Sequence, residues 1–597
     1  MGHSVALAFL LALVTMPGSA GSNPLRNDGF EEPAGTIPAM WFPYGPGRVA
    51  TDTEGAHGGR RCIRLEGGPW IELVYQWIDG AVPGSRYTAT VWAKSASGPA
   101  DGAVKIEFMD HLGNKREFPF SLKADETWRQ FTFTQTATPD AMRAALTLCA
   151  GAGATILFDD AALAGEEAKT PAKETVFDLK RLGTTIAGFG VHHWASERLA
   201  REEFGNLHIS HIRITRDSDS YDDMRELKRV TDARGIKWLY VIWVPDGKYL
   251  GLDGQLADVP GYARFWIETV RELDREGCRP HFIDLVNEPD YFGIPPAPYN
   301  ELVKLVRKEL DKAGFADVRI AGPGLTHIGA ENMDRYMKAL DANAVKAIDV
   351  WATHAWEDAW DDSGGSVSIT ENRAAQFVGM CRERDATKPV WYTEYATRQI
   401  RFHGIRYPHP DNESDNYCAS FTMPYAARVY ENTLAILNGG ANIPFYWCSQ
   451  DWWGSRKQWG YIGPQGEKKP VYHALRALYG NIKPGSRTAV PPDDMWRAPV
   501  YSGVYINEAD RTIVVGMANT ADSPRKAVIR LKNAPGRMKI VRAEAVEIDK
   551  SGDAARKIAD VARTVEKPVK LGRKGGDNML ETEIPSDGML TVILSYK

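Results

Sequence analysis

Between residues 180 and 480 the sequence alternates short apolar runs, rich in β-branched and aromatic residues, with longer amphipathic stretches. In the amphipathic stretches the apolar residues recur at three- and four-residue spacing, which is typical of helices with one buried face. Examples are residues 222–234, 263–276, 299–313 and 426–437. This alternation restricts the fold to classes in which each helix returns the chain to the start of the next parallel strand.

The short apolar runs supply eight candidate strands: 188–192, 208–214, 238–243, 282–286, 318–321, 350–354, 390–393 and 442–447. Eight strand–helix units in about 300 residues favour a closed (β/α)8 TIM barrel over an open doubly wound sheet. An open sheet more often carries a glycine-rich phosphate loop after its first strand, and Gly188-Phe-Gly190 does not continue into that pattern. We therefore expect an α/β protein built on a TIM barrel.

The segments before and after this region have the sequence pattern of β-strands. Residues 23–165 contain short β-prone runs separated by Gly, Pro and Asn/Asp turns, which predicts a jelly-roll β-sandwich. Its opening segment 23–31 and closing segment 158–163 resemble the first and last strands of carbohydrate-binding modules. The polar segment 166–179 contains Pro and is expected to be a linker, the barrel should span 180–484, and residues 485–597 should form a second β-sandwich.

The N-terminus has the pattern of an export signal. An apolar stretch at residues 4–16 is followed by small residues up to Gly21, although no Lys or Arg precedes it. This predicts a signal peptide at residues 1–22 and a secreted or periplasmic protein. No later segment has ~18 uninterrupted apolar residues, so we expect no membrane span.

Charge and cysteine content exclude other classes. With 43% hydrophobic and 25% charged residues and a formal net charge of −5 in 597 residues, nothing global indicates a nucleic-acid partner. The six cysteines contain no Cys-x-x-Cys metal pattern, and no cofactor is expected. Cys62 and Cys149 could form a disulfide after export, or remain buried thiols. Glu31, Asp159 and Asp160 could hold a structural Ca²⁺ in the N-terminal sandwich.

Two of the predicted barrel strands each lead to a glutamate at the carboxyl end, where a parallel barrel carries its chemistry. Glu288 follows the segment Phe282-Ile-Asp-Leu-Val-Asn287, and Glu394 follows Val390-Trp-Tyr-Thr393. If these follow strands four and seven, the 106 residues between them hold three strand–helix units. Glycoside hydrolysis with retention needs two such carboxyl groups ~5–5.5 Å apart, one as acid and one as nucleophile.

The ordered pair resembles clan A of the glycoside hydrolases. The matching positions are Asn287-Glu288-Pro289, which implies that Glu288 is the acid/base, and Glu394, which implies the nucleophile. Within the clan the sequence is most similar to family 30, on Gly188-Phe-Gly190, Arg213, Trp243-Val-Pro245 and Lys469-Pro-Val-Tyr-His-Ala-Leu475. Assignment to family 39, family 5 or another relative stays open. The resemblance implies a retaining β-glycosidase acting on a polysaccharide, with Trp243 at the substrate site.

Neighbouring residues have roles that follow from their chemistry. Asn287 can donate to a sugar 2-hydroxyl, and Arg213 is expected to keep Glu394 ionised. Tyr395 or His354 could donate to the nucleophile. Trp447, at the end of strand eight, offers a flat apolar face for a pyranose ring. Each has an alternative interpretation, since a buried Trp is usually core, a lone His is usually a satisfied internal group, and a strand-end Arg can be structural.

The loop after strand seven is basic. It contains Arg398, Arg401 and Arg406, and Arg456 and Lys457 follow in the next loop. Guanidinium groups make two-point contacts with carboxylate or sulfate, so these residues could bind a uronic-acid or sulfated glycan; alternatively they form a solvated loop. Several loop tryptophans suggest an extended cleft and endo action: Trp356, Trp360, Trp452, Trp453 and Trp459.

Two other functions remain alternatives at this point. A non-catalytic glycan-binding barrel is expected to have lost a catalytic carboxylate, whereas both are present. A polysaccharide lyase needs a Tyr, His or Lys base and a neutralised uronate rather than two facing carboxylates. The sequence does not specify the sugar, the linkage or the oligomeric state.

Overall fold

The computed structural model describes most of the chain from residue 25 onward. Within residues 25–597 the exceptions are 26–27, 32, 35–36, 39–40, 45–47, 54, 69–71, 80, 111–114, 142, 166–173, 217–218, 244, 252–253, 327–329, 357–366, 398–418, 452–458, 494, 496–497, 521–523 and 549–561. The expected signal peptide and the basic residues Arg398, Arg401, Arg406, Arg456 and Lys457 therefore lie outside the described residues. The chain divides into two compact units.

The first unit comprises residues 1–31, 45–108 and 116–169. Its strands lie in two five-stranded sheets, ordered β10-β7-β12-β5-β4 and β3-β6-β11-β8-β9, of which β3 is formed by residues assigned to the second unit. Buried and less buried residues alternate along β7, as expected for a strand with one face toward a core. Tyr87 of β7 and Phe108 of β8 meet edge to face at 5.4 Å between the two sheets. The strands are β3 (Phe42–Tyr44), β4 (Arg48–Asp52), β5 (Cys62–Glu66), β6 (Glu72–Asp79), β7 (Arg86–Ser95), β8 (Ala100–Met109), β9 (Lys115–Ala124), β10 (Arg129–Thr136), β11 (Arg143–Ala150) and β12 (Thr155–Gly165).

The second unit comprises residues 32–44, 109–115 and 170–597, and it contains a closed barrel of eight parallel strands. The eight strands expected from the sequence are the strands of this barrel, and the last pairs with the first. In order they are β15 (Phe189–His192), β16 (Ile209–Ile214), β17 (Lys237–Val241), β18 (Phe282–Asp284), β19 (Arg319–Leu325), β20 (Val350–Ala355), β21 (Val390–Tyr395) and β22 (Ile443–Tyr446). A short pair, β1 (Pro33–Ala34) and β2 (Ile37–Pro38), also belongs to this unit.

Helices connect the barrel strands and have clear N-terminal signals. Ser220 accepts a hydrogen bond from the Asp223 N–H at the start of α2, and Asp258 does the same for Gly261 at the start of α3. Such caps satisfy backbone donors that the first helical turn leaves free. The helices are α1 (Arg198–Arg201), α2 (Tyr221–Asp232), α3 (Val259–Arg275), α4 (Pro296–Lys312), α5 (Ala330–Ala339), α6 (Ala342–Ala347), α8 (Val367–Asp385), α9 (Met423–Asn438) and α10 (Pro470–Tyr479).

Large side chains fill the inside of the barrel below its carboxyl end. Trp391 of β21 contacts Phe282 of β18 edge to face at 4.6 Å and Phe445 of β22 at 5.7 Å. With Leu239, Ala321, Val350, Ala352 and Ile443 they form a buried cluster of their own. The barrel is therefore packed rather than hollow, and chemistry is confined to its mouth.

Strands from before the barrel join the C-terminal sheets, which corrects the expected boundaries. Thr175–Asp178 forms β13, which runs parallel to β26, and Leu182–Thr185 forms β14, which pairs with β23. Residues 174–185 thus belong to these sheets rather than to a linker or to the barrel. The remaining strands are β23 (Arg487–Ala489), β24 (Tyr501–Asn507), β25 (Thr512–Asn519), β26 (Arg525–Lys532), β27 (Met538–Ile548), β28 (Ala562–Glu566), β29 (Lys570–Lys574), β30 (Asp577–Ile584) and β31 (Gly588–Tyr596). Their orders are β13-β26-β30-β29 and β14-β23-β24-β25-β31-β27-β28.

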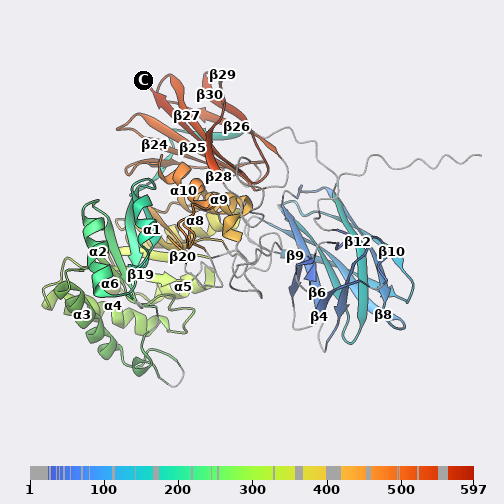
Figure 1. Cartoon of the computed structure of the whole chain (residues 1–597), viewed down its shortest axis with the longest axis horizontal. Helices are drawn as coiled ribbons and strands as arrows, with labels where there is room; N and C mark the ends of the chain where they lie inside the picture. Colours follow the sequence, from blue (N-terminus) through green and yellow to red (C-terminus); the bar gives the residue numbers. More distant parts are fainter. Residues whose placement is uncertain are drawn as a thin grey trace, which may run out of the picture. The chain divides into compact units, whose positions relative to one another are not determined.

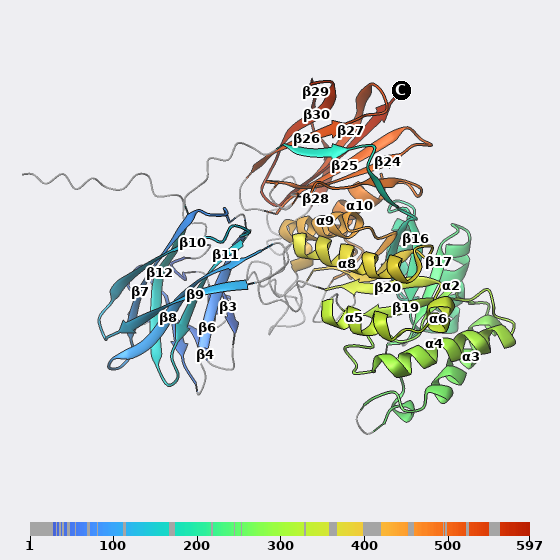
Figure 2. The same cartoon turned by 180° about the vertical axis from the view of Figure 1, so that it is seen from behind.

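Helices α9 and α10 lie between the barrel and the seven-stranded sheet in both views (Figures 1 and 2). The Tyr430 hydroxyl of α9 donates to the Leu590 carbonyl at 3.2 Å and lies 2.7 Å from the Thr591 hydroxyl of β31. Tyr430 is fully buried, so barrel and sheets share one continuous apolar core.

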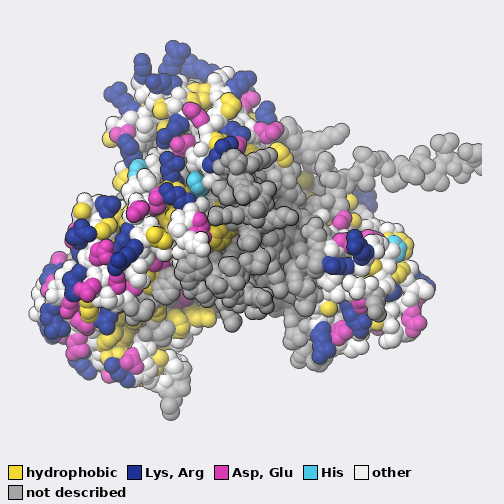
Figure 3. All heavy atoms as spheres, viewed as in Figure 1, with side chains coloured by type: hydrophobic (Ala, Val, Ile, Leu, Met, Phe, Trp, Pro, Cys, Tyr) yellow, Lys and Arg dark blue, Asp and Glu magenta, His cyan; other side chains and the backbone are white. Residues whose placement is uncertain are grey.

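Basic side chains gather at the end of the C-terminal sheets where β26 and β29 lie (Figure 3). They include the exposed Lys526 of β26 and Lys570 and Lys574 of β29. Acidic partners offset part of this charge, since Lys574 contacts Glu174 at 2.9 Å.

In the part of the chain that the structure describes, no helix has both the length and the apolar character needed to cross a membrane.

Five cysteines are described and all are buried free thiols, including Cys62 and Cys149. Cys62 lies on β5 and Cys149 on β11, which belong to different sheets of the first unit. Burial raises the pKa of each of these two thiols to about 12, so both stay protonated near neutral pH.

Candidate active site

The carboxyl ends of six barrel strands bring the predicted residues to one place. Arg213 lies on β16, His354 on β20 and Glu394 on β21. Glu288 and Asn287 follow β18 in the loop toward α4, Trp243 follows β17, and Trp447 follows β22. The strands are well separated in sequence, and only closure of the barrel makes these side chains neighbours.

Glu394 is held from both sides by fixed donors. The Arg213 guanidinium donates from Nη1 to Glu394 Oε1 at 2.5 Å, and the Trp356 indole N–H donates to Oε2 at 3.2 Å. Arg213 also donates to the Asn287 side-chain oxygen at 2.5 Å. Arg213 is fully buried and Glu394 is 5% exposed, so little water competes for these bonds. Glu394 is thus fixed in orientation beside a permanent positive charge, as a nucleophile requires.

Glu288 has different surroundings. It has a left-handed backbone conformation, with φ at 48°, and its N–H donates to the Gly324 carbonyl of β19 at 3.0 Å. Burial raises the pKa of the Glu288 carboxyl to about 7, against the opposing effect of Arg213. A carboxyl group with that pKa still carries a proton near neutral pH, as a general acid must.

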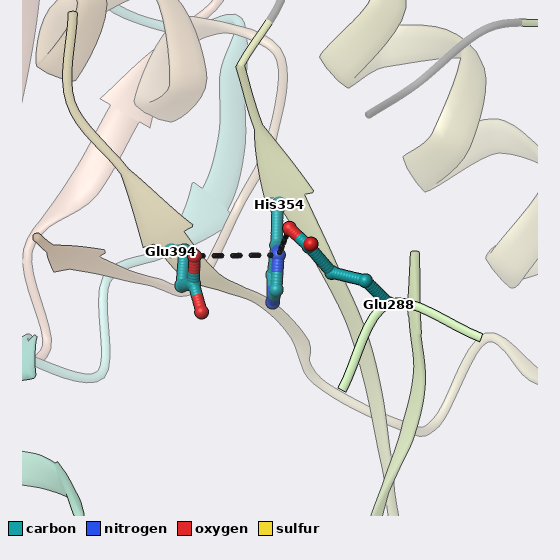
Figure 4. Close-up of side chains that lie close together, drawn as sticks. All are labelled: Glu288, His354 and Glu394. Atoms are coloured by element: carbon teal, nitrogen blue, oxygen red, sulfur yellow. Dashed lines mark hydrogen bonds and ion pairs between the residues drawn. The ribbon is translucent and has the colours of Figure 1, made fainter. Parts of the chain in front are cut away.

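His354 lies between the two carboxylates (Figure 4). Its Nδ1 is 2.9 Å from Glu288 Oε1 and 3.6 Å from Glu394 Oε2. Burial lowers the pKa of His354 to about 4, so the imidazole is neutral at working pH. A neutral ring with hydrogen on Nδ1 can donate to Glu288 without adding a charge, while Glu394 lies beyond hydrogen-bond distance from this nitrogen.

The three groups lie close together. One oxygen of Glu288, one oxygen of Glu394 and a nitrogen of His354 all lie within 4.8 Å of one another. Three such groups could in principle coordinate a metal ion. However, Arg213 places a positive charge against Glu394, where it would repel a cation, so the arrangement fits a pair of catalytic carboxyls better.

Aromatic rings form one wall of the site. Trp447 and Trp243 meet at 5.3 Å between ring centres, and both pack against His192 of β15, at 4.2 and 5.2 Å. Trp194 adds a fourth ring, 4.2 Å from His192. The Arg213 guanidinium lies 5.1 Å from the Trp243 ring centre. These rings give the site a flat apolar wall next to Arg213, the residue that holds Glu394.

Two sequence interpretations change. Tyr395 does not donate to Glu394, because its hydroxyl is bonded to Thr433 Oγ1 at 2.7 Å and to the Tyr479 hydroxyl at 2.5 Å. Successive residues of a strand face opposite sides, so Tyr395 must point outward when Glu394 points inward. The donor is Trp356, which was expected only as a loop aromatic. Its position two residues after His354, on the same face, is the signal that could have identified it.

The candidate calcium ligands serve as acceptors within the first unit. Asp159 accepts from the backbone N–H of His57 at 2.7 Å and of Gly58 at 3.0 Å. Glu31 accepts from the N–H of Arg60 at 2.7 Å and of Arg61 at 3.0 Å. Asp160 lies 2.7 Å from the His57 ring. The three carboxylates therefore converge on one loop, residues 57–61.

Comparison with known proteins adds to this geometry. Residues 22–155 match the model of a carbohydrate binding domain. The chain has a structural likeness to the glycoside hydrolase family 30 subfamily 8 xylanase Xyn30A from Clostridium acetobutylicum, with TM-score 0.50 and 14% identity, covering 71% of this chain and 99% of that one. It is also similar to AbfB, a family 51 α-L-arabinofuranosidase from Bifidobacterium longum, with TM-score 0.50 and 11% identity, covering 71% and 100%. At these identities the likeness establishes the fold. Comparison with curated protein sequences finds no significant match.

Proposed function

We propose that the protein is a glycan-degrading glycoside hydrolase that retains the configuration at the anomeric carbon. The observation that carries the proposal is the pair Glu288 and Glu394, whose nearest carboxyl oxygens and the His354 nitrogen fall within 4.8 Å at the mouth of the barrel. This spacing is close to the ~5–5.5 Å between carboxyl groups in retaining enzymes and well below the ~6.5–9.5 Å of inverting ones.

In the first step Glu394 attacks the anomeric carbon while Glu288 gives its proton to the departing glycosidic oxygen. A covalent glycosyl–enzyme ester forms, and the leaving sugar departs as an alcohol. In the second step Glu288, now a carboxylate, takes a proton from water, which attacks the anomeric carbon and releases Glu394. The different surroundings of the two groups support these roles, because burial raises the pKa of Glu288 to about 7, whereas Glu394 is paired directly with Arg213.

The substrate is proposed to be a polysaccharide. The carbohydrate binding domain matched at residues 22–155 supports a polymeric ligand. The two similar structures are a xylanase and an arabinofuranosidase, so we propose plant-type pentose-containing glycans as the first class to test. We further propose that the aromatic wall receives the sugar on the non-reducing side of the cleaved bond, and that cleavage is internal.

We also propose that Arg398 and Arg401 form a subsite for an anionic sugar. The N-terminal and C-terminal sheets are proposed to form β-sandwiches. Glu31, Asp159 and Asp160 are proposed to hold a structural Ca²⁺. The protein is proposed to be exported. An anionic subsite predicts that raising ionic strength weakens binding of a glucuronic-acid-bearing xylan but leaves binding of unsubstituted xylan unchanged.

The deciding experiment measures hydrolysis across a panel of neutral, uronic-acid and sulfated glycans. The proposal expects new reducing ends, without the ultraviolet absorbance of an unsaturated sugar, and proton NMR on a β-linked substrate should show the β-anomer first. The Glu394→Ala variant serves as the inactive control. Release of unsaturated products would indicate a lyase, and release of the α-anomer first from a β-linked substrate would contradict retention. Binding of glycans without any cleavage would favour a non-catalytic glycan-binding protein.

A further inference from the structure

The loop that carries Glu288 is anchored to the end of the neighbouring strand β19 by two separate connections. The first is the backbone hydrogen bond from the Glu288 N–H to the Gly324 carbonyl, at 3.0 Å. The second involves Asp290, two residues after Glu288. Its Oδ1 accepts from both the backbone N–H of Thr326, at 2.9 Å, and the Thr326 hydroxyl, at 3.0 Å.

These connections act on a residue that needs external support. The φ of 48° at Glu288 is in the left-handed region, which is unfavourable for a non-glycine residue and persists only where surrounding contacts require it. Directly after Glu288 the chain makes a helical turn, in which the N–H groups of Tyr291 and Phe292 both donate to the Glu288 carbonyl. Asp290 lies inside that turn, so fixing its carboxylate fixes the turn and the direction of the Glu288 side chain.

The strand end that receives both connections is itself rigid. Gly324 has φ of +64°, and a Cβ at this position would lie 2.8 Å from Oδ2 of the buried Asp284. Thr326 is 5% exposed and Asp284 is fully buried. The end of β19 therefore has little freedom to shift, and a side chain held by it is held relative to the whole barrel.

We propose that Asp290 and Thr326 are positioning residues for the acid/base: together they hold Glu288 within reach of the glycosidic oxygen. The inference rests on the proposed function, since it assumes that Glu288 donates the proton. The role is specific to proton donation, because Glu394 is positioned by another set of contacts, with Arg213 and Trp356.

The test uses the leaving group to separate positioning from stability. Aryl glycosides with 2,4-dinitrophenol as leaving group need almost no proton donation, whereas those with phenol depend on it. We expect Asp290→Ala to lower kcat for the phenyl glycoside by about 10- to 100-fold, the loss that ~1 Å of misplacement causes. For the 2,4-dinitrophenyl glycoside the rate of glycosyl–enzyme formation should change less than about threefold, because Glu394 is unaffected.

Conservative variants sharpen the result. Asp290→Asn keeps an oxygen that accepts from Thr326, so it should recover most of the phenyl glycoside activity. Thr326→Val removes one of the two hydrogen bonds and should give an intermediate, equally selective loss, while Thr326→Ser should behave as the parent. The matched control is Asp349→Ala. Asp349 accepts from the Ile320 N–H at 2.8 Å, a similar bond at the opposite end of the same strand. It should lower the melting temperature without leaving-group selectivity.

The outcomes distinguish the two proposals. If the parent enzyme cleaves neither the glycan panel nor any aryl glycoside made from its sugars, the proposed function fails. If the parent is active but Asp290→Ala and Thr326→Val lose activity equally on both leaving groups, or lose none, the positioning role is wrong while the function stands. Should Asp290→Ala fail to fold, the Thr326 variants alone decide.

Discussion

The ends of β18 and β21 present the same side chain in opposite ways. Glu394 is part of a regular strand and accepts hydrogen bonds from a guanidinium and an indole N–H. Glu288 lies beyond its strand in a left-handed conformation, and its carboxyl group contacts the neutral His354 ring at 2.9 Å. Two identical residues thus acquire different chemistry from their surroundings.

The nearby charge of Arg213 distinguishes the proposed roles of Glu288 and Glu394 more than the distance between the two carboxyl groups does. Arg213 touches Glu394 directly but affects Glu288 only through space, where burial outweighs it and leaves the Glu288 pKa raised to about 7. His354 contacts Glu288 at 2.9 Å and lies 3.6 Å from Glu394. It therefore lies against both carboxyl groups but does not make their surroundings alike.

Replacing Glu394 with Ala should remove the nucleophile and reduce kcat by about 10⁴-fold or more on every substrate, whatever the leaving group. Added azide should restore part of the rate and yield a glycosyl azide of inverted configuration, identified by NMR. A residual rate within about tenfold of the parent would remove Glu394 from the nucleophile role.

Replacing Glu288 with Ala should cost about 10²- to 10⁴-fold, but only where the leaving group needs a proton. Comparison of kcat/KM, which reports the first step, on phenyl and 2,4-dinitrophenyl glycosides measures this selectivity. Because the second step also needs Glu288 as base, the activated substrate should show a burst of 2,4-dinitrophenol followed by slow turnover. Equal losses on the two substrates would make the comparison between the two carboxylates wrong.

Replacing Trp356 with Phe keeps the ring but removes the N–H that donates to Glu394. Loss of a hydrogen bond to a charged group costs about 1.5–3 kcal/mol, so kcat should fall by about 10- to 100-fold. The loss should be the same for both leaving groups, unlike that at Glu288. Trp238→Phe is the control, since it removes an indole bond to Thr231 outside the site. A leaving-group-selective effect of Trp356→Phe would contradict the assignment.

The pH profile gives the smallest effect. Glu288 must be protonated to act as acid, and its pKa is raised to about 7, so kcat/KM on phenyl glycosides should be constant below that value and fall about tenfold per pH unit above it. On 2,4-dinitrophenyl glycosides this limb should be absent. A profile that falls instead below pH 7 would mean that Glu288 acts in its ionised form.

The sequence predicts much of this arrangement because strand order and strand ends are local properties. Apolar runs mark the eight barrel strands, and the residue at the carboxyl end of each run reaches the mouth, which places Arg213, Glu288, His354 and Glu394 together. Strand alternation could also have excluded Tyr395 and favoured Trp356.

Other features depend on contacts between distant segments. The bonds between Asp290 and Thr326 join two loops, and no periodicity in either segment signals them. The same holds for β13 and β14, which are four residues each and pair with strands hundreds of residues away. The sequence of a short strand says little about which strand it pairs with, because the residues that set the pairing and its register lie elsewhere in the chain.

The pairing of β13 with β26 has a consequence for how the protein is made. Thr175 aligns with Ile529, about 350 residues later in the chain. At a synthesis rate of about 5–20 residues per second, β13 leaves the ribosome roughly 20 to 70 s before its partner exists. During that interval the barrel can close, but the strand ahead of it has an unpaired edge open to association with other chains. Heterologous production should therefore improve with slower initiation or with a holdase chaperone, and an expression fragment that ends after the barrel would leave this edge permanently open.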